Sequence, residues 1–374
     1  MAMTRLLLFA FLFLLSLLVF FRAPTSLLWY VTILVAEFSL VFVLAIGLLL
    51  HLWKPASGPY GKSSTILGAL TLLVFLLPTF QGFFLSRRAA KEFGAAFPKA
   101  AQTSFSFNPF KIFTGFTTMP VAFTTLRYDS TTQLSLDYYK GQGSGLHPCV
   151  VVIHGGSWAG GDSKQLPELN SELAKSGYSV ASINYRLAPE HHFPAPIEDV
   201  AAALRFLKSK AADLSIDIQS FYLLGRSAGG QIALVAGYTL NDPSIKGVID
   251  FYGPADMVWG YQNPTNPLVL NSRKVMEDYL GGTLSQVQKQ YDNSSATQLV
   301  KSGNPPTLMI YGKHDPLVSH LHGYRLSPIL KAAGVPHFEL YLPWATHGFD
   351  YTLNGPGGQL STGIVKRFIE ATKR

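Results

Sequence analysis

The sequence contains almost no cysteine and few charged residues. Cys149 is the one cysteine among 374 residues, so the chain cannot form an internal disulfide. Charged residues amount to 14%, whereas about a quarter is usual for a soluble domain. Acidic residues are scarcest in the first 120 positions, which contain Glu37 and Glu92 and no others. This deficit predicts that the N-terminal part of the chain contacts lipid.

The distribution of basic residues bears on the class of partner. The first 120 residues hold nine Lys or Arg that flank apolar runs, while the remainder of the chain is nearly neutral. A nucleic-acid-binding domain needs a basic face on its folded surface. The charge pattern therefore argues against a nucleic acid as partner and indicates a lipid bilayer.

Three apolar runs occupy residues 6–21, 27–50 and 66–85, the second interrupted by Glu37 and the third containing Pro78. Each is close to the length of about 20 residues that spans a bilayer. The alternative for the first run is a signal peptide that begins after Arg5. However, the next run follows almost at once and no small-residue cleavage site separates the two. We therefore expect an uncleaved transmembrane region of three helices over residues 1–86, and thus an integral, multi-pass membrane protein.

The distribution of basic residues only weakly indicates which end of each helix faces the cytoplasm. Three spans place Arg5, Lys54 and Lys62 on one side of the membrane; Arg22, Arg87, Arg88 and Lys91 lie on the other. Because the two sides are so similar, the positive-inside rule hardly discriminates between them. We favour an extracytoplasmic position for the C-terminal domain. Glu37 has two interpretations, a functional intramembrane acid or a carboxylate bonded to a neighbour or to a backbone group.

A linker over residues 87–120 precedes a globular domain at 121–374. Residues 121–128 and 134–139 alternate as two half-exposed strands of a hairpin. Strand-like runs then follow at 150–153, 179–184, 221–224, 246–252, 307–311 and 338–342, and helix-like runs separate most of them. Such alternation predicts an α/β fold with a mainly parallel sheet covered on both faces. Residues 254–304 interrupt it, as an inserted cap or, alternatively, an exposed excursion.

One pentapeptide in this domain has the form of a nucleophile elbow. Gly225-Arg226-Ser227-Ala228-Gly229 stands between a strand-like and a helix-like run, as Gly-x-Ser-x-Gly does in hydrolases. Small neighbours allow a sharp strand-to-helix turn that exposes the serine above the sheet. The alternative is an ordinary turn with incidental glycines.

Three further loops follow strand ends, where an active site of this architecture gathers. Gly155 and Gly156, after His154, allow backbone N–H groups to approach a developing oxyanion, and His154 holds this loop in shape. Asp315 and His347 follow later strands. They can serve as orienting acid and general base in the chain order Ser, Asp, His of α/β-hydrolases.

Other titratable residues are weaker candidates. Asp350 is a minor alternative to Asp315, because it lies so close to His347 in sequence. His320 and His322 form a His-x-His pair, but this spacing at a helix start puts them on different faces. Since no cluster of Cys, Asp or Glu completes a zinc set, we interpret both as surface or cap residues and expect neither a metal nor a cofactor.

Residues 121–374 resemble the hormone-sensitive lipase-like branch of the α/β-hydrolases, which overlaps in motif with bacterial carboxylesterases and kynurenine formamidases. The resemblance is carried by residues 154–162, Tyr185-Arg186-Leu187-Ala188-Pro189-Glu190, Phe193-Pro194-Ala195-Pro196, Glu198-Asp199, residues 225–230, Asp315-Pro316-Leu317, Ala333-Gly334-Val335 and His347-Gly348-Phe349. It implies an α/β-hydrolase fold with Ser227 as nucleophile, His347 as base and Asp315 as orienting acid. It also implies an oxyanion hole formed by the N–H groups of Gly155, Gly156 and Ala228.

The oxyanion loop departs from the common family pattern. Ser157 replaces a third glycine, and Trp158 gives the His-Gly-Gly-x-Trp form seen in formamidases and some esterases. These two residues, with Trp259 and Tyr261 of the insertion, are the candidates for substrate binding. We expect hydrolysis of a small-molecule or lipid carboxylic ester through an acyl-enzyme. The alternatives are a formamidase or amidase, an acyltransferase, or a domain that binds a ligand without catalysis.

Overall fold

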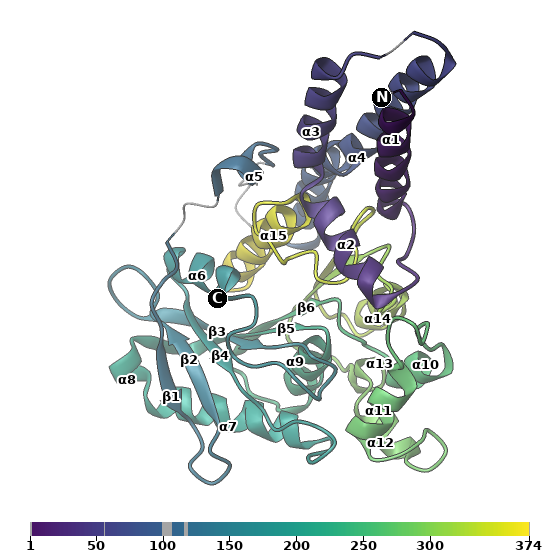
Figure 1. The fold of residues 1–374 in the computed structure, drawn as a ribbon. Helices are drawn as coiled ribbons and strands as arrows, with labels where there is room; N and C mark the ends of the chain where they lie inside the picture. The colour runs from purple at the N-terminus through teal and green to yellow at the C-terminus, as the bar shows by residue number, and fades with distance from the viewer. Residues whose placement is uncertain (1, 56, 99–106, 116–118, 374) are drawn as a thin grey trace.

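The computed structural model describes residues 2–55, 57–98, 107–115 and 119–373 (Figure 1). Its strands are β1 (Thr124–Arg127), β2 (Ser135–Tyr139), β3 (His147–Ile153), β4 (Ser179–Ile183), β5 (Ile216–Arg226), β6 (Ile245–Phe251), β7 (Thr307–Gly312) and β8 (His337–Leu342). They form one sheet in the order β1-β2-β4-β3-β5-β6-β7-β8. Among these strands β2 alone runs in the opposite direction, antiparallel to both β1 and β4, and the other pairs are parallel. The predicted α/β fold with a mainly parallel sheet is therefore confirmed.

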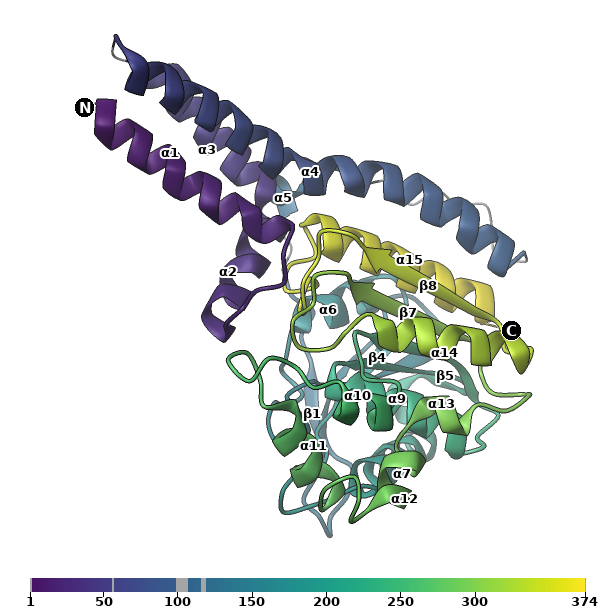
Figure 2. The same ribbon diagram turned by 90° about the vertical axis from the view of Figure 1, so that its right-hand side faces the viewer.

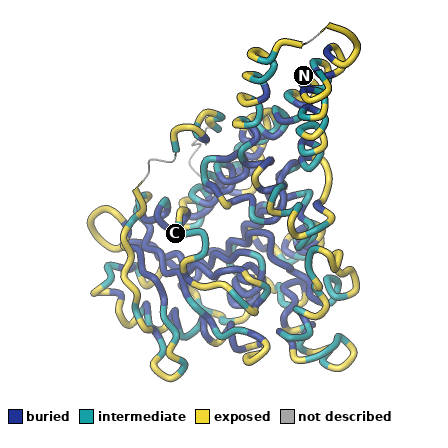
Figure 3. Tube along the Cα trace, viewed as in Figure 1, coloured by how far each residue is buried: buried dark blue, intermediate teal, exposed yellow. Residues whose placement is uncertain are grey.

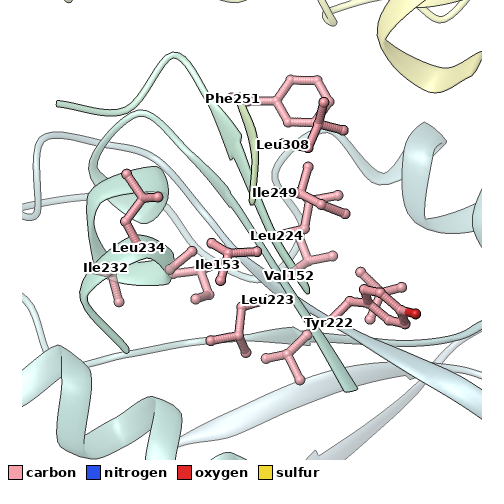
Figure 4. Close-up of a cluster of buried hydrophobic side chains, with 14 of the residues drawn as sticks. Val152, Ile153, Tyr222, Leu223, Leu224, Ile232, Leu234, Ile249, Phe251 and Leu308 are labelled. Atoms are coloured by element: carbon pink, nitrogen blue, oxygen red, sulfur yellow. The ribbon is translucent and has the colours of Figure 1, made fainter. Parts of the chain in front are cut away.

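The core lies on both sides of the central strands. Every residue of β3 and β4 is buried, as expected for parallel strands that are covered on both faces. Figure 4 shows apolar side chains from neighbouring strands and from the following helix packed together: Val152, Ile153, Tyr222, Leu223, Leu224, Ile232, Leu234, Ile249, Phe251 and Leu308. In Figure 3 the central strands are coloured as buried. Cys149 is buried in β3.

Helices cover the two faces of the sheet. On one face lie α7 (Ala195–Ser209) and α9 (Ala228–Thr239), while α6 (Pro167–Lys175) and α15 (Pro356–Thr372) lie on the other (Figures 1 and 2). The short α8 (Ala211–Leu214) precedes β5, and α14 (Leu321–Ala332) connects β7 to β8. Because the parallel strands all point the same way, the loops that follow them meet at one edge of the sheet.

The hairpin prediction was right in part. The outer strand β1 is mostly exposed, but four of the five residues of β2 are buried. The expected half-exposure of β2 was wrong because this strand pairs with β4 as well as with β1 and so lies inside the sheet.

The insertion after β6 forms four short helices. They are α10 (Met257–Gln262), α11 (Ser272–Leu280), α12 (Gln288–Asn293) and α13 (Ala296–Leu299). These helices lie beside the loops at the C-terminal ends of the strands (Figure 1). The ring of Tyr279 in α11 stacks on Trp158, with centroids 4.6 Å apart and planes inclined by 4°. This stacking fastens the insertion to the oxyanion loop.

The N-terminal helices form a bundle that projects from the sheet domain (Figure 2). They are α1 (Ala2–Ser16), continued by the 3-10 turn η1 (Leu17–Val19), α2 (Ser26–Glu37), α3 (Ser39–Leu52) and α4 (Pro59–Ala96). Two described segments, Ala2–Val19 and α4, are long and apolar enough to cross a membrane. The pair α2 and α3 would add a third if counted as one broken span, bent by 77°.

The bundle is apolar on its outside as well as its inside. Phe9, Val35, Ile46 and Phe75 form its small core. Its exposed surface carries further large apolar side chains, among them Leu7, Phe11, Leu14, Leu44, Leu48, Ile66, Leu70 and Leu73. A helix bundle that is apolar all round is typical of a membrane span, because lipid solvates the outer side chains.

The second apolar run is not one straight helix. It breaks at Phe38, and its first half, α2, leaves the bundle and lies on the sheet domain (Figure 2). Glu37 explains the position of the break. Its Oε2 accepts hydrogen bonds from the N–H groups of Gly357 (2.8 Å) and Gly358 (3.4 Å) at the start of α15. These contacts correspond to the second of the two interpretations of Glu37, a carboxylate bonded to backbone groups.

Helix α4 continues beyond the expected end of the transmembrane region. It runs to Ala96 and packs on the sheet domain through Phe93, whose ring lies edge-on to Phe338 with centroids 5.3 Å apart. The first ten residues of the predicted linker at 87–120 are therefore helical. Short α5 (Lys111–Thr114) follows, while linker residues 99–106 and 116–118 lie outside the described residues.

Candidate active site

Ser227 lies in the tight turn between β5 and α9. Its backbone has φ of 53° and ψ of −119°, a conformation that costs a residue with a side chain about 1–3 kcal/mol. Glycine is needed on both sides of it. A Cβ on Gly225 would lie 1.9 Å from the carbonyl oxygen of Gly229, and a Cβ on Gly229 would lie 2.1 Å from that of Ile153. The Gly-x-Ser-x-Gly pattern thus follows from the close approach of strand, turn and helix.

His347 and Asp315 come together from the loops after β8 and β7. The distance from His347 Nδ1 to Asp315 Oδ2 is 2.7 Å, and both side chains are buried. The other carboxylate oxygen, Asp315 Oδ1, accepts from the N–H groups of Leu317 (2.7 Å) and Val318 (2.9 Å). The carboxylate is therefore fixed in position by its own loop.

This contact also determines which nitrogen of His347 carries the proton. An ionised carboxylate only accepts hydrogen bonds, so Nδ1 of the imidazole must donate to Asp315. In the neutral ring, Nε2 then keeps its lone pair and can accept a proton. Ser227 and His347 line the same cavity. The arrangement can therefore support proton transfer from a hydroxyl to an imidazole.

Asp350 has different partners from Asp315. Its Oδ2 pairs with Nε of Arg226 at 2.5 Å, and its Oδ1 accepts a hydrogen bond from the hydroxyl of Tyr252. The minor alternative for the orienting acid is thus engaged elsewhere, whereas Asp315 contacts the imidazole of His347.

The oxyanion loop differs from the expectation at one position. The N–H group of Gly155 donates to Oε1 of Gln165 at 2.7 Å, so another acceptor already occupies this predicted donor. The next residues turn sharply, with positive φ at Gly156 (123°), Ser157 (54°) and Trp158 (58°). The neighbouring N–H groups of Gly156 and Ser157, with that of Ala228 at the start of α9, are the better candidates for oxyanion donors.

His154 stabilises this loop from behind. Its Nδ1 lies 2.8 Å from the carbonyl oxygen of Gly155, and its ring stacks on Tyr185 with centroids 4.3 Å apart. Burial lowers the pKa of His154, which favours the neutral ring. These contacts agree with the expected role of His154 in holding the loop rather than transferring protons.

The four candidate substrate-binding residues occupy different environments. Ser157, Trp158 and Trp259 line a cavity beside Ser227. Trp158 is buried, and its Nε1 donates to Oε1 of Gln231 at 2.9 Å, so it supports the loop as well as lining the cavity. The hydroxyl of Tyr261 donates to Glu277. Tyr261 is not among the described residues that line either cavity beside Ser227, so the structure gives no support to its predicted role.

Of the two interpretations of His322, a surface residue or a cap residue, the first was wrong and the second agrees with the structure, because its ring lies edge-on to Trp259 of α10 with centroids 4.9 Å apart. This side chain is buried, and its Nδ1 accepts a hydrogen bond from the N–H group of Asp256 at 3.2 Å. Burial lowers its pKa to about 4, so the ring is neutral at ordinary pH. The error arose because the first turn of α14 is covered by α10. Among the described residues, no group of three or more His, Cys, Asp or Glu side chains is arranged to hold a metal ion.

Two cavities meet at Ser227. The cap cavity, of about 370 Å³, lies toward the insertion and has a mixed lining: apolar residues such as Trp158, Trp259, Met276 and Leu317 alternate with the polar residues Arg22, Asn263, Asn266, Asp315, Ser319 and His322. The α2 cavity, of about 830 Å³, lies toward the N-terminal helices, and its other wall includes Gly156, Ser227 and His347. The helix side of the α2 cavity is formed by Ser26, Trp29, Tyr30, Ile33, Leu34 and Phe38.

The contribution of α2 was missed in the sequence. Nε1 of Trp29 donates to the carbonyl oxygen of His347 at 2.8 Å, and the two rings lie edge-on with centroids 6.0 Å apart. The available signal was the interruption of the second apolar run by Glu37 and the polar or aromatic residues before it. That run was interpreted as one span because its length was sufficient for a bilayer.

Comparison with known proteins supports the same interpretation of the fold. The BD-FAE family model matches residues 136–330, from β2 to α14. This chain belongs to the BD-FAE family. The matched region of this BD-FAE protein contains Ser227 and Asp315, whereas His347 and the N-terminal helices lie outside it.

Individual relatives of this BD-FAE protein are esterases. Carboxylesterase NlhH of Mycobacterium tuberculosis is 30% identical over 263 residues, which cover 67% of this chain and 81% of that protein. The probable carboxylic ester hydrolase LipM of the same organism is 28% identical over 241 residues, covering 60% of this chain and 54% of LipM. The match to LipM thus spans about half of that protein. These relatives are hormone-sensitive-lipase-like carboxylesterases, as the resemblance predicted.

A solved structure shares the fold. An esterase from Pyrobaculum calidifontis superimposes with a TM-score of 0.60 at 23% identity, covering 72% of this chain and 95% of that one. At this identity the likeness establishes the α/β-hydrolase fold alone. The fold prediction from the sequence is thereby confirmed.

Proposed function

We propose that this protein is a membrane-anchored serine carboxylesterase that hydrolyses carboxylic esters through an acyl-enzyme. The observation that carries the proposal is the hydrogen bond of 2.7 Å from His347 Nδ1 to Asp315, with Ser227 in the adjoining cavity. In this assignment Ser227 is the nucleophile, His347 the general base and Asp315 the acid that orients the imidazole. The esterase relatives support the reaction class.

The reaction proceeds in two balanced steps. Nε2 of His347 takes the proton of Ser227 as its oxygen bonds to the ester carbonyl carbon, and the same proton then passes to the departing alcohol. The acyl group remains on Ser227. A water molecule, deprotonated by His347, attacks the acyl carbon, and Ser227 recovers a proton as the carboxylic acid leaves.

Backbone N–H groups stabilise the negative charge of the tetrahedral intermediates. We assign this role to Gly156, Ser157 and Ala228, because the Gly155 N–H group donates to Gln165. Each such donor typically contributes about 3–4 kcal/mol to the stabilisation of the transition state. No step of this mechanism requires a metal ion or an organic cofactor.

Membrane attachment is the second part of the proposal. Two spans are formed by α1 with η1 and by the first part of α4, and α3, the half of the broken pair that stays in the bundle, is the third. Together they carry the sheet domain on the side of Arg22 and Arg87. The apolar exterior of the bundle supports this arrangement. We assign the catalytic domain to the extracytoplasmic side, as the sequence favoured.

The catalytic assignment is tested by Ser227→Ala in the full chain. We expect loss of hydrolysis of short aryl esters and loss of covalent labelling by a fluorophosphonate, with an unchanged thermal unfolding temperature. Ser220→Ala, a buried serine in the first half of β5, is the matched control and should keep both properties. Continued labelling of Ser227→Ala would overturn the assignment, while absence of labelling in the folded wild-type protein would favour a binding domain.

The bond that is cleaved is tested with a panel of substrates. Aryl esters, acetylated sugars and formylated aromatic amines are compared by kcat/KM, with and without an added alcohol as acyl acceptor. Ester hydrolysis should dominate. A preference for the amides would favour a formamidase, and transfer to the alcohol in place of hydrolysis would favour an acyltransferase.

The orientation is tested with a cysteine variant. Because Cys149 is buried, Ser209→Cys provides one exposed thiol on α7. A membrane-impermeant maleimide should label this variant in spheroplasts before lysis. Labelling that appears only after lysis would place the catalytic domain on the cytoplasmic side.

A further inference from the structure

Helix α2 connects two elements of the bundle and therefore lies at its base. The chain leaves α1 and η1 at Val19, crosses the sheet domain as α2, and returns to the bundle at Ser39. The axis of α2 is bent by 77° from that of α3 (Figure 2). If α1 and α3 are spans, both ends of α2 are held at the same membrane surface. This helix then lies along the interface between the bilayer and the catalytic domain.

One stripe of α2 is fixed to the loops of the candidate active site. Trp29, Ile33 and Glu37 are four residues apart and so lie on one helix face. Trp29 donates to the His347 carbonyl oxygen, and Glu37 accepts from the Gly357 N–H group. Between them Ile33 is buried against Gly348. The position of α2 is thus specified by polar contacts at both ends and an apolar contact in the middle.

The neighbouring stripe of α2 faces the α2 cavity and the exterior together. Tyr30 and Leu34 line the cavity although their side chains are 61% and 50% exposed. A residue that both lines a cavity and is half exposed lies at the mouth of that cavity. Tyr351, 60% exposed and in the loop after His347, lines the same cavity. The mouth is therefore aromatic and aliphatic, and it opens beside the helix that lies at the membrane surface.

The two cavities at Ser227 differ in chemistry. The cap cavity is the smaller and includes charged and amide side chains such as Arg22, Asn263 and Asn266. The α2 cavity is more than twice as large, and its helix wall is aliphatic and aromatic apart from Ser26. Its volume is within the range of about 300–1,000 Å³ that is usual for small-molecule sites. An ester with one polar and one long apolar half fits this division.

We propose that the α2 cavity binds the hydrocarbon chain of a long-chain carboxylic ester, which enters from the bilayer surface between Tyr30, Leu34 and Tyr351. The proposal rests on the assignment of Ser227 as nucleophile, and it names the substrate class of that same site. Each methylene group that moves from water into the cavity increases kcat/KM by up to about fourfold until the cavity is filled. The N-terminal helical region is then part of the substrate site as well as an anchor.

The test uses the full-length protein in lipid vesicles and a series of aryl esters with acetyl, octanoyl and dodecanoyl groups, beside a series of acetates of alcohols of matching length. One of the two series should show kcat/KM rising with chain length in the wild-type protein. Leu34→Trp fills the mouth with a large side chain. It should lower the ratio of kcat/KM for the long-chain esters of that series to kcat/KM for the acetyl ester by about tenfold or more.

Leu27→Trp is the matched control. Leu27 is on α2 and 72% exposed, but it is not among the residues lining the cavity. This variant should keep the wild-type chain-length profile. The proposal would be overturned if the wild-type protein preferred short chains in both series. It would also be overturned if Leu34→Trp affected short and long esters equally. In either case, turnover of the acetyl ester would still support the esterase assignment. If the wild-type protein hydrolysed none of these esters, that result would instead contradict the proposed function itself.

The route of entry is tested by the location of the ester. The dodecanoyl ester is placed either in the vesicles that carry the protein or in separate vesicles of the same composition. Entry from the bilayer predicts a faster initial rate for the first arrangement, whereas the soluble acetyl ester gives equal rates. Equal rates for the dodecanoyl ester in both arrangements would mean that the substrate arrives through water, and would overturn entry from the bilayer.

Discussion

Arg226, the residue before Ser227, forms a buried ion pair with Asp350, which lies in the loop of His347. The distance from Arg226 Nε to Asp350 Oδ2 is 2.5 Å, and both side chains are almost completely inaccessible. Tyr252 donates to the same carboxylate, and its ring lies 4.3 Å from that of His347. The pair therefore ties the serine turn to the histidine loop, independently of the contact between His347 and Asp315.

Asp350→Asn should destabilise the fold. It leaves the guanidinium of Arg226 buried without its counter-charge, a change that typically costs about 3–5 kcal/mol. We expect a clear decrease in the thermal unfolding temperature of the detergent-solubilised protein. The double variant Arg226→Met/Asp350→Asn removes the unpaired charge and should recover part of the loss. A double variant less stable than Asp350→Asn would contradict this account of the pair.

Asp315→Asn should reduce activity strongly and stability only a little, in contrast to Asp350→Asn. It preserves packing but removes the acceptor that holds His347 in its Nδ1–H form, so kcat is expected to fall by up to about 10⁴-fold. The unfolding temperature should change less than in Asp350→Asn, because Asp315 has no cationic partner among its described contacts. If ester hydrolysis survived Asp315→Asn but was abolished by Asp350→Asn, Asp350 and not Asp315 would be the acid that orients His347.

The sequence was sufficient for the features that local patterns encode. Alternating apolar runs predicted the parallel sheet, and the glycines around Ser227 predicted a turn whose geometry in fact excludes any Cβ at Gly225 and Gly229. Loop positions after strands led to the prediction of Asp315 and His347, whose side chains lie 2.7 Å apart in the structure. Each of these inferences depends on short stretches of chain and on the known topology of parallel sheets.

Features that depend on contacts between distant segments could not be predicted in this way. Whether the N–H group of Gly155 can donate to an oxyanion depends on Gln165, because Oε1 of Gln165 accepts a hydrogen bond from that N–H group. His322 is buried because the insertion covers it. The docking of α2 depends on a pairing of Trp29 with His347 across most of the chain. Hydropathy reports how apolar a segment is, and cannot distinguish burial against protein from burial in lipid.

Gln165→Ala tests the role of the Gly155 N–H group. If Gln165 only fixes the oxyanion loop, its removal loosens that loop, and we expect kcat to fall by about tenfold with little change in KM. Gln298→Ala, an exposed glutamine of α13, should behave as wild type. A kcat that rises in Gln165→Ala would indicate that the released Gly155 N–H group stabilises the oxyanion after all.

Glu37 makes the stability of the α2 contact depend on pH. Burial raises the pKa of Glu37 to about 8 from an ordinary value of 4.5; the Gly357 and Gly358 N–H groups and Trp344 oppose this shift, and the charge of Asp350 adds to it. Below about pH 4.5 the group is neutral in the folded and unfolded states, and its contribution to stability is complete. Between about pH 4.5 and 8 only the unfolded state ionises, so stability falls as pH rises.

The measurement is the unfolding temperature of wild type and Glu37→Gln across this pH range. Glutamine does not ionise, so the variant should gain stability relative to wild type between pH 5 and pH 8, by an amount of the order of a few kcal/mol. Glu92→Gln, at an exposed position of α4, should follow the wild-type curve. A difference between wild type and Glu37→Gln that is independent of pH would contradict the raised pKa.

Trp29→Phe separates positioning of His347 from binding of the substrate chain. Phenylalanine keeps the ring against the imidazole but loses the hydrogen bond of 2.8 Å to the His347 carbonyl oxygen, which is worth about 1 kcal/mol. We expect kcat to fall by about fivefold for acetyl and dodecanoyl esters alike, with KM little changed, because the loop that carries the base is less well held. Trp53→Phe, at the end of α3, is the control for a tryptophan away from the site. If Trp29→Phe affected dodecanoyl esters alone, Trp29 would serve only as a wall of the cavity. If kcat were unchanged for both esters, the contact would not position His347.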